Sequence, residues 1–341
     1  MRLIRISLAA ALLAGGGALA VTTAGSAFAN DLVTPVLTID ATTEPGHVVR
    51  ILGAATGLPA EAFPAVTFVR TDAESPTGGK PIRVPLGEGG AINLTDAPPA
   101  GGTITYLAST PELDGYAVVT AQLTVTLPFS TPALSLTNNK SVFSYAEPVR
   151  FTATLGDTWT NRKVEIWSDP AGADQGARLL GSGTVNGYHL YSVPLTLTRN
   201  TVVTVKFAGD TRFAPRSVTS TVGTRVAAST AITKHYKTAK IGSTAYQYVR
   251  KAKNPVFTTT MTYQPGRKQK LAFEYYSAGT WKAWKSGLFA LNTAGKSTWT
   301  LTGTHKTGVR YRVRTGYLPG TSGDTLNTAT YGAWKYFTFT S

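Results

Sequence analysis

Residues 201–217 read TVVTVKFAGDTRFAPRS, and this stretch decides the class of fold. Val203, Val205 and Phe207 alternate with polar residues, so they share one face of an extended strand. Gly209 and Pro215 then mark turns. The same rhythm of short alternating segments and Gly, Pro, Asn or Asp breaks recurs after residue 30, and helical periodicity is nearly missing. The sequence therefore predicts an all-β protein.

A repeat of about a hundred residues runs through the chain, which is the size of one immunoglobulin-like unit. Its lead aromatic residues are Tyr106, Phe207 and Tyr311, each at the end or in the middle of an alternating segment. Many short strands at even spacing are typical of β-sandwiches. We therefore expect three tandem Ig-like β-sandwich domains, over residues 31–128, 129–226 and 230–341.

The segment FAGDTRFAPRS at 207–217 resembles the aromatic-x-Gly-Asp-x-x-Tyr-x-Pro-x-Ser stretch of bacterial Ig-like repeat domains. Gly209 permits the positive φ of a tight corner, Asp210 can accept hydrogen bonds from its own turn, and Phe213 can plug the end of a sandwich. As a whole the chain resembles exported Ig-like repeat proteins of Gram-positive bacteria. That resemblance implies a fold and an extracellular location, and it implies no activity.

The first thirty residues have the pattern of a secretory signal peptide. Arg2 and Arg5 precede an apolar run over residues 6–14, and the triplet AFA at 27–29 supplies a small-x-small cleavage site. We expect residues 1–29 to be removed by cleavage after Ala29, which predicts a secreted protein. Elsewhere the sequence has no segment approaching eighteen apolar residues, so we expect no membrane-spanning helix in the mature chain.

Several classes of chemistry have no support in the sequence. Cysteine is absent, which excludes disulfides, thiolate zinc sites, iron–sulfur clusters and a cysteine nucleophile. No G-x-S-x-G motif is present to hold a hydrolase serine. The four histidines lie far apart, without metal-ligand spacing, at His47, His189, His235 and His305. The sequence thus predicts a non-catalytic protein with no metal site and no cofactor.

Charge is distributed unevenly along a chain whose formal net charge is +15. Residues 31–128 hold ten acidic residues against four basic ones, whereas residues 227–341 hold seventeen Lys and Arg against two acids, Glu274 and Asp324. A strongly basic domain favours an anionic partner.

The basic residues of the last domain follow the strand alternation. Arg310, Arg312 and Arg314 fall on one face of a predicted strand, and Tyr311 and Val313 fall on the other. Like charges so close together repel one another unless an anion screens them. The alternative is a solvated outer face that keeps an exported protein soluble and blunts edge pairing.

Three further cations lie on or before a second predicted strand of that domain, and they complete a candidate anion-binding surface: Arg267, Lys268 and Lys270. The expected partner is an anionic cell-wall polymer or extracellular polysaccharide, such as wall teichoic phosphate, and anionic lipid headgroups also fit. Nucleic acid ranks below these, because no nucleic-acid-binding module pattern is present.

A second hypothesis is a carbohydrate-binding accessory protein. Trp281 and Trp284 lie three residues apart, so on a strand they face opposite sides. An exposed Trp284 beside Tyr276 could stack on a sugar ring. In the alternative interpretation, both tryptophans fill or edge the core of the sandwich.

Overall fold

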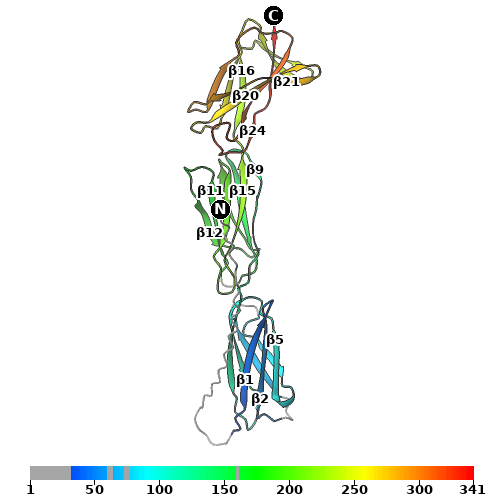
Figure 1. The fold of residues 1–341 in the computed structure, drawn as a ribbon, viewed down its shortest axis with the longest axis vertical. Coiled ribbons are helices and arrows are strands. Elements are labelled where there is room, and N and C mark those ends of the chain that lie inside the picture. The colour runs from blue at the N-terminus through cyan, green and yellow to red at the C-terminus, as the bar shows by residue number, and fades with distance from the viewer. Residues whose placement is uncertain (1–31, 60–63, 73–76, 159–160) are drawn as a thin grey trace, which may run out of the picture. The chain divides into compact units, whose positions relative to one another are not determined.

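The computed structural model describes residues 32–59, 64–72, 77–158 and 161–341. The expected signal peptide at 1–29 lies outside these residues. The described chain is built of β-strands, joined by turns and one short 3₁₀ turn at Glu88–Gly90. The strands form small sheets that face one another in pairs (Figure 1), which confirms the prediction of an all-β fold of tandem sandwich-like units.

The chain divides into two compact units. One contains residues 1–132, 157–162 and 208–216, and the other contains residues 133–156, 163–207 and 217–341. The sheet pairs fall within residues 36–127, 134–224 and 228–340, which we call the first, second and third sandwiches. The domain boundaries expected from the turn signals stay predictions.

The first sandwich has sheets of strand order β1-β2-β5 and β4-β3-β6-β7. Val49 and Ile51 of one sheet meet Phe68, Ile104 and Tyr106 of the other in a fully buried core. Its strands are β1 (Val36–Glu44), β2 (Val48–Thr56), β3 (Ala65–Thr71), β4 (Pro81–Pro85), β5 (Ala91–Asp96), β6 (Gly102–Ser109) and β7 (Thr120–Leu127).

The second sandwich has sheets of order β13-β10-β8 and β12-β11-β14-β15-β9. Val203, Val205 and Phe207 of β14 are buried, as their alternation predicts. Its strands are β8 (Leu134–Leu136), β9 (Val142–Phe143), β10 (Glu147–Leu155), β11 (Lys163–Pro170), β12 (Arg178–Thr184), β13 (Leu190–Leu197), β14 (Thr201–Phe207) and β15 (Arg216–Thr224).

The corner after β14 has the geometry expected from the sequence. Gly209 adopts φ 81°, in the left-handed region that glycine enters without strain. The Asp210 Oδ1 atom accepts hydrogen bonds from the backbone N–H groups of Arg212, at 2.8 Å, and Phe213, at 2.7 Å. Phe213 is buried. The turn is therefore held by the aspartate side chain.

The third sandwich has a small sheet, β16-β19-β22, and a large one, β17-β18-β25-β23-β20-β21, with β24 paired to β23. Phe257 of the small sheet packs against Phe273 and Phe337 of the large one, with ring centroids 4.9 and 5.3 Å apart. The strands are β16 (Ala228–Thr233), β17 (Lys237–Ile241), β18 (Thr244–Arg250), β19 (Val256–Met261), β20 (Lys268–Ser277), β21 (Thr280–Ala290), β22 (Lys296–Thr300), β23 (Arg310–Tyr317), β24 (Thr330–Tyr331) and β25 (Lys335–Thr340).

The loop between β23 and β24 is hydrogen-bonded to the end of the second sandwich. The Asn327 Nδ2 group donates to the carbonyl oxygens of Thr198, at 3.0 Å, and Thr224, at 3.2 Å. The hydroxyl of Thr328 donates to Asn200 Oδ1, at 3.0 Å. These bonds hold in place the loop that also carries Asp324.

Candidate anion-binding face

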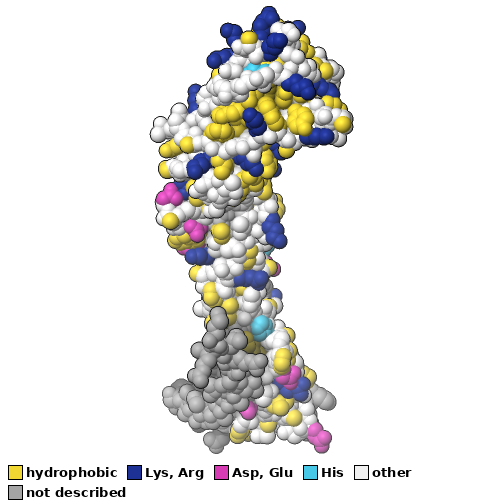
Figure 2. All heavy atoms as spheres, turned by 45° about the horizontal axis from the view of Figure 1, so that its top comes forward, with side chains coloured by type: hydrophobic (Ala, Val, Ile, Leu, Met, Phe, Trp, Pro, Cys, Tyr) yellow, Lys and Arg dark blue, Asp and Glu magenta, His cyan; other side chains and the backbone are white. Residues whose placement is uncertain are grey.

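The central strand of the large sheet places three arginines on one face. Arg310, Arg312 and Arg314 are half-buried on the outer face of β23, whereas Tyr311 and Val313 are buried in the core at 7% and 0% exposure. The shared face expected from the alternation is therefore present. Figure 2 shows Lys and Arg side chains gathered over the third sandwich, around hydrophobic side chains.

Each of these arginines stacks on one or two aromatic rings, which come from other strands or from the loop between β24 and β25. The Arg312 guanidinium carbon lies 4.4 Å from the ring centroid of Trp281 and 4.2 Å from that of Trp334. The Arg314 guanidinium carbon lies 4.3 Å from the Trp334 centroid and 4.2 Å from that of Tyr331. Guanidinium groups are attracted to ring faces at these separations.

Arg310 completes the row at its other end, because its guanidinium carbon lies 3.7 Å from the Tyr276 centroid. The rings of Tyr276 and Trp281 are in turn 5.3 Å apart. We call this row the arginine–aromatic ladder; it consists of Tyr331, Arg314, Trp334, Arg312, Trp281, Tyr276 and Arg310.

One arginine of the ladder, Arg312, is paired with a carboxylate. Glu274 of β20 lies directly opposite Arg312 in the sheet register, and its Oε2 atom accepts hydrogen bonds from Arg312 Nε, at 2.8 Å, and Nη2, at 2.5 Å. Among the described residues, no carboxylate lies within ion-pair distance of Arg310 or Arg314. The expected cationic face is therefore partly neutralised, at its middle arginine.

The other expected cations lie in different environments. Lys268 is exposed, and Lys270 is half-buried on the same face of β20 as Glu274. Arg267, in contrast, has a fully buried side chain, and the expectation that it faces an anionic surface is wrong. Its Nε and Nη2 atoms donate to the two carboxylate oxygens of Asp324, at 2.7 and 2.8 Å.

The guanidinium of Arg267 can be buried because hydrogen bonds within the domain use four of its five N–H groups. Besides the two bonds to Asp324, its Nη1 atom donates to the Thr262 carbonyl, at 3.0 Å, and its Nη2 atom donates to Asn327 Oδ1, at 2.8 Å. Burial and a hydrogen bond to Asp324 raise the pKa of Tyr317 to about 12. Burial would raise the pKa of Asp324, but hydrogen bonds from Arg267 and Tyr317 outweigh it and lower that pKa, so the carboxylate stays ionised.

Trp281, and not Trp284, is the tryptophan whose ring contacts Tyr276. It lies on the arginine face. Trp284 packs on the core side, with its ring centroid 5.0 Å from Tyr311 and 6.2 Å from Phe273, and 36% of it is exposed. A bulge in the pairing of β20 with β21 lies at this point. The expected pairing of Trp284 with Tyr276 on one face is therefore corrected.

Trp284 lines a hollow of about 470 Å³ where β20 ends and β23 begins, which we call the aromatic pocket. Tyr276, Tyr311, His305 and Lys306 also line it. The His305 ring stacks on Phe339 with centroids 4.1 Å apart. Burial lowers the pKa of His305, which keeps the imidazole neutral at pH 7. The pocket is therefore mainly aromatic, and Lys306 is the lysine among the described residues that line it.

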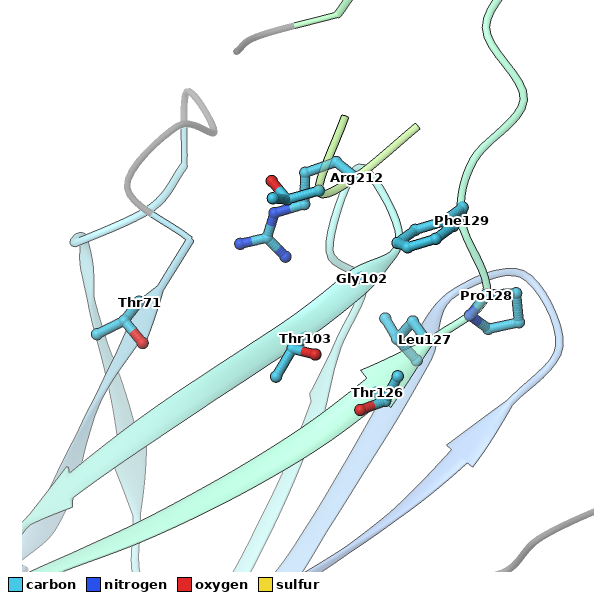
Figure 3. Close-up of a pocket in the computed structure, with 9 residues that line it drawn as sticks. Thr71, Gly102, Thr103, Thr126, Leu127, Pro128, Phe129 and Arg212 are labelled. Carbon is cyan, nitrogen blue, oxygen red and sulfur yellow. The ribbon is translucent and has the colours of Figure 1, made fainter. Parts of the chain in front are cut away.

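The first unit contains a larger hollow, of about 680 Å³, lined mainly by threonine and apolar side chains. Figure 3 shows Arg212 beside the loop at Gly102 and across from Thr71 and Thr103. The Arg212 Nη1 group donates to the Gly101 carbonyl, at 3.1 Å. Among the described residues that line this hollow, none is an acid or a histidine.

The described residues contain no group of three or more His, Cys, Asp or Glu side chains that could hold a metal ion. None of their helices has the length and apolar character needed to cross a bilayer.

The ladder contains three residues that the sequence analysis did not select as site residues: Trp281, Tyr331 and Trp334. A signal for Trp334 was present, since its alternation with Lys335 and Phe337 puts it on the face opposite a core residue. That signal is useful only once the pairing of β25 with β23 is known.

No protein-family model matches the sequence, and no curated protein matches it. Among solved structures, chicken CNTN1 domains FN1–FN3 share 8% identity over 87% of this chain and 94% of theirs, with a TM-score of 0.25. The BSP domain of a biofilm-associated protein shares 8% identity over 93% of this chain and 68% of its own, with a TM-score of 0.22. Escherichia coli alpha-2-macroglobulin shares 12% identity over 85% of this chain, which spans only 29% of that protein, with a TM-score of 0.22. Similarities this distant carry no argument about function.

Proposed function

We propose that this chain is a secreted, non-catalytic binding protein of the bacterial cell surface. It attaches through the outer face of the third sandwich to an anionic polymer of the cell wall or the extracellular matrix. The observation that carries the proposal is the arginine–aromatic ladder, which fixes Arg310 and Arg314 on one strand with no carboxylate partner among the described residues. The leader-like sequence at 1–29 supports export.

The spacing of the ladder suits an extended ligand. Residues two apart on a strand are separated by about 6.7 Å, so Arg310 and Arg314 lie about 13 Å apart along β23. Exposed Lys268 lies on the same face of the neighbouring strand β20. Neutralising such exposed charges releases counterions and is screened by salt, so the affinity for a polyanion should fall as ionic strength rises.

The test is retention of the secreted chain on purified Gram-positive cell walls across a salt series. We expect elution at moderate salt, and earlier elution of the double variant Arg310→Gln/Arg314→Gln. Lys251→Gln/Lys253→Gln is the matched control, because it removes the same charge from exposed positions in the turn after β18. Retention that ignores salt, or equal retention of the two double variants, would contradict the proposal.

A second candidate function, carbohydrate binding as an accessory protein, is favoured by the aromatic pocket. Its rings from Trp284 and Tyr311 offer flat apolar surfaces of the kind that pack against a sugar ring. A polysaccharide pull-down compares Trp284→Ala with Trp167→Ala, a half-buried tryptophan of the second sandwich. If sugar binding drives attachment, only Trp284→Ala abolishes it, and salt has little effect.

A further inference from the structure

The aromatic pocket and the arginine–aromatic ladder meet at one residue. Tyr276, near the end of β20, is among the residues that line the pocket, and its ring carries the Arg310 guanidinium at 3.7 Å on the arginine face. The two residues come from β20 and β23, which are paired in one sheet, so their relative position is fixed by backbone hydrogen bonds. The pocket therefore lies at the end of the sheet where the ladder has its first arginine, next to Val309 and Tyr311, the chain neighbours of Arg310.

The lining of the pocket has a definite chemical character. Its volume of about 470 Å³ falls within the range of about 300–1,000 Å³ that small-molecule sites occupy. Aromatic rings form its walls, and the hydroxyls of Ser277 and Thr304 add polar groups. Among the described residues that line it none has a carboxylate, and Lys306 contributes a positive charge. This combination fits a sugar ring, which has apolar faces and hydroxylated edges, when the ring also bears an acid group.

A ligand with only sugar rings or only negative charge would contact only one of the two features, the aromatic pocket or the arginine–aromatic ladder. A neutral glycan would leave Arg310 and Arg314 without an anionic partner, and a polyanion without rings would leave the walls of the pocket uncovered. We infer that the polymer bound by this protein is an acidic glycan, with one sugar ring in the aromatic pocket and acid groups of neighbouring units against Arg310 and Arg314. This inference rests on the proposed function and names its ligand class.

The experiment compares three probes by isothermal titration calorimetry on the full chain at one ionic strength. Polygalacturonate has a carboxylate on every ring, its methyl-esterified form has the same backbone without charge, and inorganic polyphosphate has charge without rings. We expect polygalacturonate to bind at least about tenfold more tightly than either of the other two, because only it engages both the rings and the arginines.

Two variants test the pocket separately from the ladder. Trp284→Leu removes a pocket wall, and Lys306→Gln removes an exposed cation of the pocket; Trp167→Leu and Lys296→Gln are the matched controls elsewhere in the chain. We expect each pocket variant to weaken polygalacturonate several-fold more than its control does, and Trp284→Leu to leave polyphosphate binding unchanged. If Trp284→Leu fails to fold, Lys306→Gln decides, because its side chain is exposed.

The outcomes separate this inference from the function on which it rests. Equal binding of polygalacturonate and polyphosphate, with no effect of the pocket variants, overturns the acidic glycan and leaves anionic attachment standing. Equal binding of the charged and esterified glycans removes the role of the ladder in recognition. Failure of all three probes to bind overturns the proposed function itself.

Discussion

Replacing Arg267 with methionine would remove a cation from inside the third sandwich and leave its partner behind. The side chain is fully buried, and Asp324, which is 12% exposed, loses both of its hydrogen bonds from the guanidinium. The carbonyl of Thr262 and the Oδ1 atom of Asn327 lose donors as well. Methionine has similar length and fills the space, so the loss is one of charge and hydrogen bonding.

The expected cost follows from what remains buried. Removing one partner of a buried ion pair destabilises a protein by about 3–5 kcal/mol, because the other charge is left uncompensated. With a urea dependence of about 2 kcal/mol per M, the unfolding midpoint should fall by about 1.5–2.5 M. The double variant Arg267→Met/Asp324→Leu should recover much of the lost stability, because it leaves no isolated charge inside the domain. The Tyr317 hydroxyl keeps an acceptor, since it donates to the backbone carbonyl of residue 324, at 3.1 Å.

Urea unfolding followed by tryptophan fluorescence provides the measurement. Four of the six tryptophans lie in the third sandwich, so its transition dominates the signal: Trp281, Trp284, Trp299 and Trp334. Arg250→Met is the matched control, because Arg250 is exposed and stacks on Tyr236, at 4.6 Å, as Arg267 stacks on Tyr317, at 4.7 Å. A loss below about 1 kcal/mol for Arg267→Met, or a double variant as unstable as the sum of the single ones, would refute the reasoning.

Three further outcomes are expected. Trp334→Ala removes the ring between two arginines of the ladder and should cost at least about 1–2 kcal/mol in urea unfolding, as two cation–π contacts are lost; an unchanged midpoint would contradict the ladder's contribution. Burial lowers the pKa of His305 from 6.5, so the unfolded chain binds a proton at this residue more readily than the folded one does. The contribution of His305 to stability is therefore complete above pH 6.5 and is lost as the pH falls below that value. Melting scans at pH 7.5 and 5 should show His305→Gln to be less sensitive to acid than the parent chain. Gly53→Ala would put a Cβ atom within the contact distance of the Thr38 carbonyl and should cost the first sandwich about 1–3 kcal/mol in thermal unfolding, whereas an unaltered melting curve would contradict the close approach of β1 and β2.

Features set by local geometry could be predicted from the sequence. The side chains of a strand alternate between its faces, so the shared face of Arg310, Arg312 and Arg314 needed no knowledge of neighbouring strands. The corner at Gly209 and Asp210 likewise depends on bonds within a few residues. In both places the residues that decide the structure lie next to one another in the chain.

Features set by register could not be predicted in this way. Glu274 neutralises Arg312 because β20 and β23 pair with these residues opposite each other, and a single sequence does not give that alignment. Arg267 sits in a polar turn that reads as exposed, yet its partner Asp324 is 57 residues further along the chain. The partner of Tyr276 also depended on how β21 is paired, where a bulge interrupts the register near Trp284.

The stacking of the arginines also affects the entropy of any association. A free arginine on a surface samples many rotamers, and ordering such a side chain at an interface costs about 0.5–1.5 kcal/mol. In this domain the guanidinium of Arg314 is clamped between Trp334 and Tyr331, so its freedom is already lost when the chain folds. An anion that meets this side chain finds its N–H groups already oriented, and lysine, which has no planar group to clamp, could not take its place.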